Sequence, residues 1–156
     1  MIPALVVGAA AFAGVLIAGD DPFVGTWKLN PAKSTYFPGP APQGPPGMFK
    51  YELNPGGGLR VTVIGFTPEG KADDHVRVET YDGTPHPVVG DRGADAIAAR
   101  RPTPYVIEGE NSKLGKPPLY FFRAVSADGQ TLTVTFDSMN PNGERTAHNV
   151  RVYDKQ

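Results

Sequence analysis

Short apolar runs separated by turns make up nearly all of the sequence after Asp20, and this pattern constrains the fold more than any other feature. Each run is rich in Val, Thr, Tyr and Phe and has the length of a β-strand. We predict about nine strands: Val24–Asn30, Met48–Leu53, Leu59–Phe66, His75–Tyr81, Ala96–Arg100, Tyr105–Glu110, Leu119–Val125, Thr131–Asp137 and His148–Tyr153.

Alternation of apolar and polar residues within these runs predicts an antiparallel sheet with one face toward the core. Val61 and Val63 alternate with Thr62, and Val76 and Val78 alternate with charged residues in the same way. Asx-Gly pairs between the runs supply the positive φ that tight hairpins need. Such short strands and turns indicate a sandwich or a barrel, and a barrel also removes exposed edges. We therefore predict an all-β, antiparallel up-and-down barrel.

The first nineteen residues, MIPALVVGAAAFAGVLIAG, contain no charged side chain. As a helix, residues 1–19 would extend about 28 Å, close to the thickness of a hydrocarbon core. Two interpretations stay open: a signal peptide cleaved after Ala18 and Gly19, or a retained transmembrane anchor with a Gly/Ala face. Both predict a hydrophobic helix before the barrel domain, residues 20–156. Both also predict an extracytoplasmic location, periplasmic or secreted, with anchoring to the inner membrane in the second case.

Composition and motifs argue against several classes of function. The chain has 15 basic and 16 acidic residues without a clustered basic run, which argues against nucleic-acid binding. It has no cysteine, so it has neither disulfides nor thiolate metal ligands. No nucleophile elbow, P-loop, dinucleotide fingerprint or metal-ligand spacing occurs. We expect a protein without catalytic residues, metal or cofactor.

One connection is long and rich in proline. Pro31–Gly47 contains six prolines and three glycines among seventeen residues. Because proline cannot continue a helix or a central strand, we predict an irregular loop that crosses the barrel exterior. Its role is that of a spacer, or of a docking strap or lid that presents Tyr36 and Phe37.

Two segments at opposite ends of the barrel domain carry a family resemblance. The run FVGTWKL at 23–29 is similar to the first strand of fatty-acid-binding proteins and holds the Gly-x-Trp of lipocalins, here Gly25 and Trp27. The run RVYDK at 151–155 resembles the last strand of the same proteins. The chain thus resembles the calycin superfamily, and small exported bacterial lipocalin-like domains within it. The resemblance implies that Arg151 and Tyr153 hold a ligand carboxylate, and that the proline-rich loop stands where the family has a helical lid.

The residues themselves leave other roles open for Arg151. In one of them, Arg151 stacks on the ring of Trp27 and closes one end of the barrel. Gly25 and Trp27 would then be structural residues of that closed end. Strand alternation favours a third position, because it places Val150 and Val152 on one face and Arg151 and Tyr153 on the other. If the valines fill the barrel, the polar pair faces solvent.

Two functions follow from these expectations. The first is a binding module for a small apolar or acidic ligand. The alternative is a membrane-anchored accessory subunit that docks on a membrane protein complex through the barrel and the proline-rich loop. A ligand carrier would keep an internal cavity, whereas an accessory barrel would be filled by its own side chains.

Overall fold

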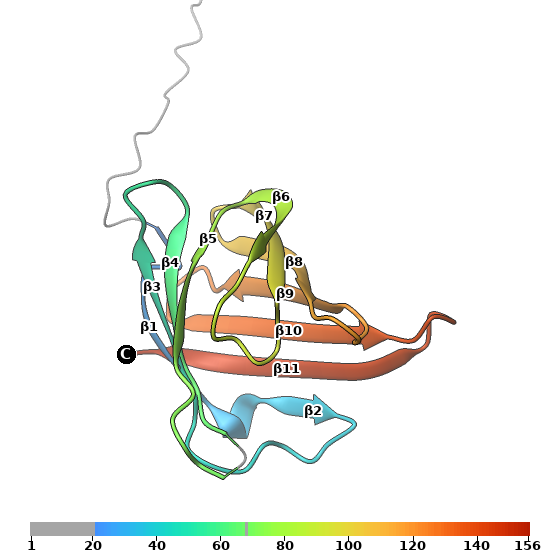
Figure 1. Cartoon of the computed structure of the whole chain (residues 1–156). Coiled ribbons are helices and arrows are strands. Elements are labelled where there is room, and N and C mark those ends of the chain that lie inside the picture. The colour runs from blue at the N-terminus through green and yellow to red at the C-terminus, as the bar shows by residue number, and fades with distance from the viewer. Residues whose placement is uncertain (1–20, 68) are drawn as a thin grey trace, which may run out of the picture.

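The computed structural model describes residues 21–67 and 69–156, which form one antiparallel sheet curled into a nearly closed barrel (Figure 1). In chain order the elements are β1 (Gly25–Leu29), the 3-10 helix η1 (Pro31–Lys33), β2 (Thr35–Phe37), β3 (Met48–Leu53), β4 (Leu59–Ile64), β5 (His75–Glu79), β6 (Asp82–Pro87), β7 (Ala96–Thr103), β8 (Val106–Ser112), β9 (Leu119–Val125), β10 (Thr131–Met139) and β11 (Arg145–Lys155). The predicted all-β, antiparallel class is confirmed.

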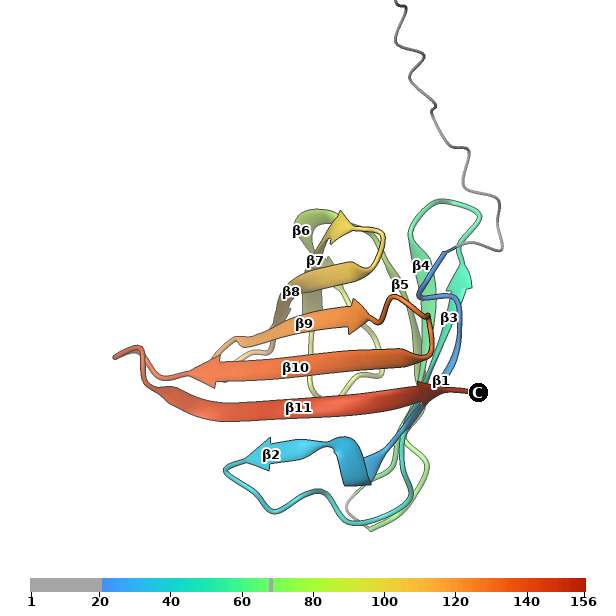
Figure 2. The same cartoon turned by 180° about the vertical axis from the view of Figure 1, so that it is seen from behind.

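The order of strands across the sheet is that of an up-and-down barrel. It runs β5-β4-β3-β1-β11-β10-β9-β8-β7-β6, and β2 pairs separately with β11. Strands β1 and β11 lie far apart in the sequence but pair antiparallel, with Trp27 opposite Lys155. Strands β5 and β6 are the two edges. Figure 2 shows the long strands β9, β10 and β11 side by side on the opposite wall from β4 and β5.

The two ends of the barrel differ in their packing. The apolar core fills the end that holds the β3–β4 and β9–β10 turns and the chain's C-terminus, which we call the packed end. Its fully buried side chains include Phe23, Trp27, Leu59, Ile107 and Leu132. The other end, which we call the rim, carries the β4–β5, β6–β7, β8–β9 and β10–β11 loops. Residues 38–47, here called the strap, also lie at the rim.

The proline-rich connection is more regular than predicted. Its first part forms η1, capped by Asn30, and then β2, which pairs with β11 through Thr35–Val150, Tyr36–Asn149 and Phe37–His148. The cause is the length of β11: β1 covers only its last residues, so the earlier part has free hydrogen-bonding groups that β2 satisfies. The prediction of an irregular loop is wrong for η1 and β2 and holds for the strap.

Two further differences concern β5 and β6. Strand β6 was not among the predicted strands. It contains Pro85 and Pro87 and is an edge strand, where missing N–H donors are tolerated. Strand β5 turns toward the core the face that was predicted to be exposed. Its valines are 46% exposed, whereas its charged residues face inward, because Arg77 lies opposite the fully buried Val61 of β4.

The predicted N-terminal helix, residues 1–19, lies outside the described residues. Within the part of the chain that the structure describes, no helix is long and apolar enough to cross a bilayer.

Candidate binding site

Both residues that the family resemblance selected point into the barrel. Arg151 lies opposite Val134 and Tyr153 opposite Leu132, and both of these β10 side chains are fully buried. Directly opposed residues in a sheet share a face, so Arg151 and Tyr153 share the interior face. The expectation from alternation, with Val150 and Val152 inside, is wrong. The interior of this barrel accepts polar groups where the strand pattern favoured apolar ones.

A second inward arginine lies on the same row as Arg151. Arg123 of β9 also pairs with Val134, from the other side, and is only 2% exposed. Its guanidinium lies 4.3 Å from the ring centroid of Phe121. Its Nη1 donates to Oε2 of Glu79 on β5 across the barrel, at 2.6 Å. Sequence reasoning missed Arg123, although it follows Phe121 by two residues and therefore shares that strand's apolar face.

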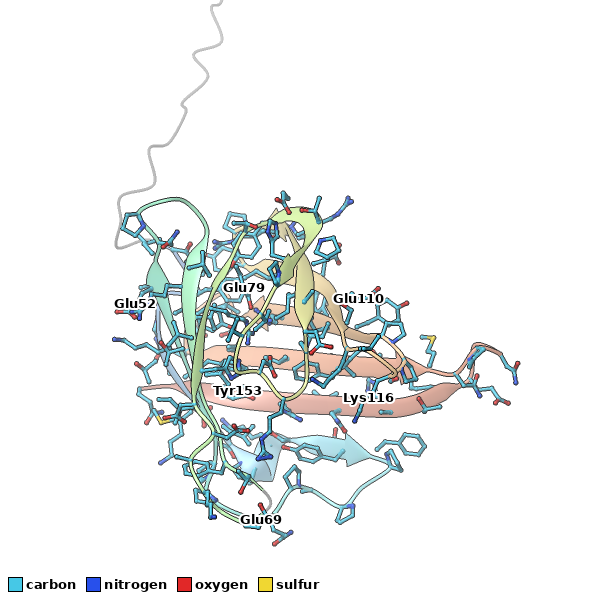
Figure 3. The ribbon with its side chains drawn as sticks, viewed as in Figure 1. Glu52, Glu69, Glu79, Glu110, Lys116 and Tyr153 are labelled. Atoms are coloured by element: carbon cyan, nitrogen blue, oxygen red, sulfur yellow. The ribbon has the colours of Figure 1, made fainter. Side chains whose placement is uncertain are left out.

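Strand β5 and the β6–β7 loop contribute further charged residues to the interior. Arg77 Nε donates to Oε1 of Glu79 at 2.8 Å, and its Nη1 lies 3.6 Å from Oδ2 of Asp91 in the β6–β7 loop. His75 Nε2 lies 3.4 Å from the same carboxylate oxygen. Burial, opposed by Asp91 and reinforced by Arg77, lowers the pKa of His75, so the imidazole is neutral at pH 7. Figure 3 shows Glu79 inside the barrel, whereas Glu52 and Glu69 point outward.

The interior therefore holds more positive than negative charge. Arg77 and Arg123 are neutralised by Glu79 and Asp91. Arg151 forms no ion pair with any described residue, and its buried Nε has no hydrogen-bond partner among them. Its guanidinium instead lies 4.9 Å from the Phe136 centroid and 5.8 Å from that of Tyr36. The aromatic rings stabilise the cation only partly, so an anion would complete the site.

Two cavities meet at Arg151. The inner chamber, of about 230 Å³, lies in the barrel interior, and the outer chamber, of about 280 Å³, lies beneath the strap. Phe49, Val63 and Arg151 line both. The inner chamber is otherwise lined by His75, Arg77, Asp91, Gly93, Asn111, Leu119, Arg123, Phe136 and Asn149. The outer chamber is lined by Leu29, Pro31, Tyr36, the strap residues 41–47, Met48, Ile64, Gly65, Phe66 and Tyr153.

Tyr153 lines the outer chamber together with Arg151. Its ring centroid is 5.1 Å from that of Phe49, and the residue is 4% exposed. Burial raises the pKa of Tyr153 to about 12, although Arg151 acts in the opposite direction. The phenol is therefore protonated at neutral pH and can donate a hydrogen bond to an acceptor beside Arg151.

The predicted closure residues lie at the packed end, away from both chambers. Trp27 is fully buried, and its indole Nε1 donates to the carbonyl of Phe23 at 2.8 Å. The cation over its ring is Lys155, with Nζ 5.1 Å from the centroid. The expectation that Arg151 stacks on Trp27 is therefore wrong. Gly25 has φ 138°, and a side chain there would meet Lys155 Cε at 2.8 Å.

Comparison with known proteins identifies the fold. The sequence matches no family model and no curated protein sequence. The structure matches "As-p18, an extracellular fatty acid binding protein", with a TM-score of 0.53 and 12% identity over 87% of this chain and 97% of that one. The fold is that of a fatty-acid-binding-protein β-barrel.

The barrel also matches the fluorescent protein UnaG. The wild-type UnaG structure gives a TM-score of 0.51 at 13% identity, over 86% of this chain and 97% of that one. A mutant form of UnaG gives 0.54 at 12% identity. Within the described residues of the barrel, no group of three or more His, Asp or Glu side chains is arranged to hold a metal ion.

Proposed function

We propose that this calycin barrel is a non-catalytic binding module for a small amphipathic acid, with the acidic group held by Arg151 and Tyr153. The observation that carries the proposal is the unpaired inward guanidinium of Arg151 at the junction of two cavities. A guanidinium and a phenol on alternate residues of β11 can together bind one carboxylate. The resemblance of the fold to a fatty-acid-binding protein supports the same ligand class.

The cavities favour this function over that of an accessory subunit. A barrel with only a structural role would be filled by its own side chains. This one is filled at the packed end only, and chambers of about 230 and 280 Å³ remain near the rim. Their combined volume lies within the range of small-molecule sites in proteins.

We also propose that the module works outside the cytoplasm, in the periplasm or the secreted fraction, or anchored to the inner membrane. The support is the uncharged segment at residues 1–19, which has the composition of a signal peptide or a membrane anchor. Fractionation of cells that express the full chain, with N-terminal sequencing of the recovered protein, tests the location and distinguishes cleavage from retention.

The binding function is tested by titrating a fluorescent fatty-acid analogue and its methyl ester into Arg151→Met. Wild type should bind the acid and discriminate against the ester, whereas the variant should bind the acid at least tenfold more weakly, about 1.4 kcal/mol. The matched control is Arg60→Met, because Arg60 lies on the outer face of β4. The variant should also fold at least as stably as wild type, since it loses an unpaired cation. Equal affinity in the folded variant would refute the assignment.

A further inference from the structure

The two chambers differ in chemistry, and the difference restricts the ligand further. Apart from Arg151 and the Tyr153 hydroxyl, the outer chamber is lined mainly by apolar side chains, Ile64, Phe66 and the prolines of the strap among them. An apolar group is favourable there because it leaves water and displaces no hydrogen bond. At about 30 Å³ for each water-sized group, the chamber accommodates roughly nine heavy atoms.

The inner chamber is polar, and part of its polarity is unsatisfied. Arg123 is 2% exposed and lines the chamber, and its Nε has no partner among the described residues. The Nε of Arg151 and the Oδ1 of Asn111 are also buried and without partners in the described part of the chain. Two of these atoms are donors and one is an acceptor.

A plain hydrocarbon tail does not suit such a chamber. Each buried polar atom that loses access to water without gaining a partner costs about 1–3 kcal/mol. A long acyl chain that continued from the outer into the inner chamber would separate the polar side chains of its lining, Arg77, Arg123 and Asn149 among them, from water. An occupant that suits this lining carries acceptors for the guanidiniums of Arg123 and Arg151 and a donor for the amide of Asn111.

We propose that the ligand is a compact amphiphile whose apolar part lies beneath the strap. Its polar head, an acidic group with a hydrogen-bond donor one or two bonds away, lies between Arg151 and the inner chamber. N-acylated amino acids and hydroxy acids have this chemistry. This inference rests on the proposed function, because it places the same acidic group on Arg151. It adds that Arg123 and Asn111 recognise the rest of the head group.

Three acids of similar length provide the test, with dissociation constants measured by isothermal titration calorimetry on the 20–156 chain. N-octanoylglycine has an amide N–H beside its carboxylate, N-octanoylsarcosine replaces that hydrogen with a methyl group, and decanoate has neither amide nor donor. We expect N-octanoylglycine to bind at least tenfold more tightly than each of the other two. Hexadecanoate should bind no better than decanoate, because its tail exceeds the outer chamber.

Two variants test where the head group and the apolar part of the ligand bind. Asn111→Leu should abolish the preference for N-octanoylglycine over N-octanoylsarcosine, while Asn142→Leu, in the β10–β11 turn, should preserve it. Ala41→Phe, which fills the outer chamber, should weaken binding of decanoate and N-octanoylglycine alike.

The possible failures are distinguishable. If affinity rises steadily from decanoate to hexadecanoate, or if Asn111→Leu leaves the preference intact, the head-group inference is wrong and the proposed acid-binding function stands. If none of the acids binds to the folded chain, the proposed function itself is wrong.

Discussion

Glu79 and Arg123 form an ion pair across the barrel interior, with 2.6 Å between Oε2 and Nη1 and each side chain only 2% exposed. Arg77 donates to the other oxygen of the same carboxylate. The pair joins the edge strand β5 to β9 on the opposite wall, although β5 and β6 do not pair along the open seam. The charges inside the barrel therefore hold the edge strand where backbone pairing is missing.

Breaking this pair should destabilise the fold strongly. Removal of one partner of a buried ion pair leaves an uncompensated charge and costs about 3–5 kcal/mol. We therefore expect Glu79→Gln to lower the free energy of unfolding by that amount in urea denaturation. Glu52→Gln is the control, because its pairs with Lys50 and Arg60 are exposed, and its effect should stay within about 0.5 kcal/mol. The double variant Glu79→Met/Arg123→Met should have a higher free energy of unfolding than Glu79→Met alone. Equal values would contradict the coupling.

The same carboxylate predicts how stability depends on pH. Burial acts to raise the pKa of Glu79, but Arg123 and Arg77 outweigh it and lower the pKa from 4.5 to about 2. The folded state therefore binds this proton less readily than the unfolded state. The stabilisation is present above pH 4.5 and is lost as the pH falls toward 2, by about 3 kcal/mol. Urea midpoints between pH 6 and pH 2 should show this loss, and a folded Glu79→Gln variant should lack it.

The complete burial of Trp27 predicts a large effect at the packed end. Trp27→Ala should cost about 3–5 kcal/mol, as for other buried aromatic residues. Lys155→Met should cost no more than about 1 kcal/mol, because it removes a cation–π contact but keeps an apolar stem over the ring. Neither variant should change the affinity for an acidic probe, since both residues lie outside the two chambers. Denaturation midpoints and probe titrations measure the two effects separately.

The proline-rich connection should show two classes of amide exchange. The amides of β2 pair with β11, so they should exchange as slowly as the amides of the β11 residues opposite them, 148–150. The strap, residues 38–47, has few backbone partners, so its amides should exchange within seconds in the ligand-free protein. Binding of N-octanoylglycine should slow exchange at Gly44 and Gly47, which line the outer chamber. Uniformly slow exchange without ligand would argue against a lid role.

Two adjacent glycines provide a matched test of how closely β5 packs against the β3–β4 turn. Gly57 and Gly58 both have positive φ, of 94° and 74°, so alanine strains the backbone at either position. Only at Gly58 would the added methyl group also collide with a backbone carbonyl, that of Glu79. Gly58→Ala should therefore be clearly more destabilising than Gly57→Ala. Equal unfolding free energies would show that β5 can move away from this turn without cost.

The sequence was sufficient for the architecture, and it singled out two residues that the structure places on the interior face. Strand length, Asx-Gly turns and the FVGTWKL run indicated a calycin barrel, and the RVYDK run located Arg151 and Tyr153. The inward charges of β5 could not be found this way, because alternation separates two faces but does not say which one is inside. Pairing with Val61 and Val63 decides that, and pairing is a property of the assembled sheet.

Other parts of the site carried weaker signals or none. Arg123 was recognisable as the one charged residue on an apolar strand face between Phe121 and Val125, a position that requires a buried partner. Asp91 comes from a loop, and nothing in its neighbourhood predicts that it reaches His75 and Arg77. Strand β2 formed because β11 is longer than β1, which depends on two strands more than a hundred residues apart in the sequence.

Asp21 and Gln156 both lie at the packed end. Asp21 is held there by Arg101 at 2.7 Å, and the amide of Gln156 donates to the carbonyl of Thr26. The strap and the rim are on the far side of the barrel (Figures 1 and 2). Anything joined to the chain before Asp21, whether a bilayer, a solid support or a fused reporter, therefore meets the closed floor of the barrel. The mouth is directed away from that attachment, so a tethered copy would exchange its ligand with the solution or with a partner opposite, and not with the surface that carries it.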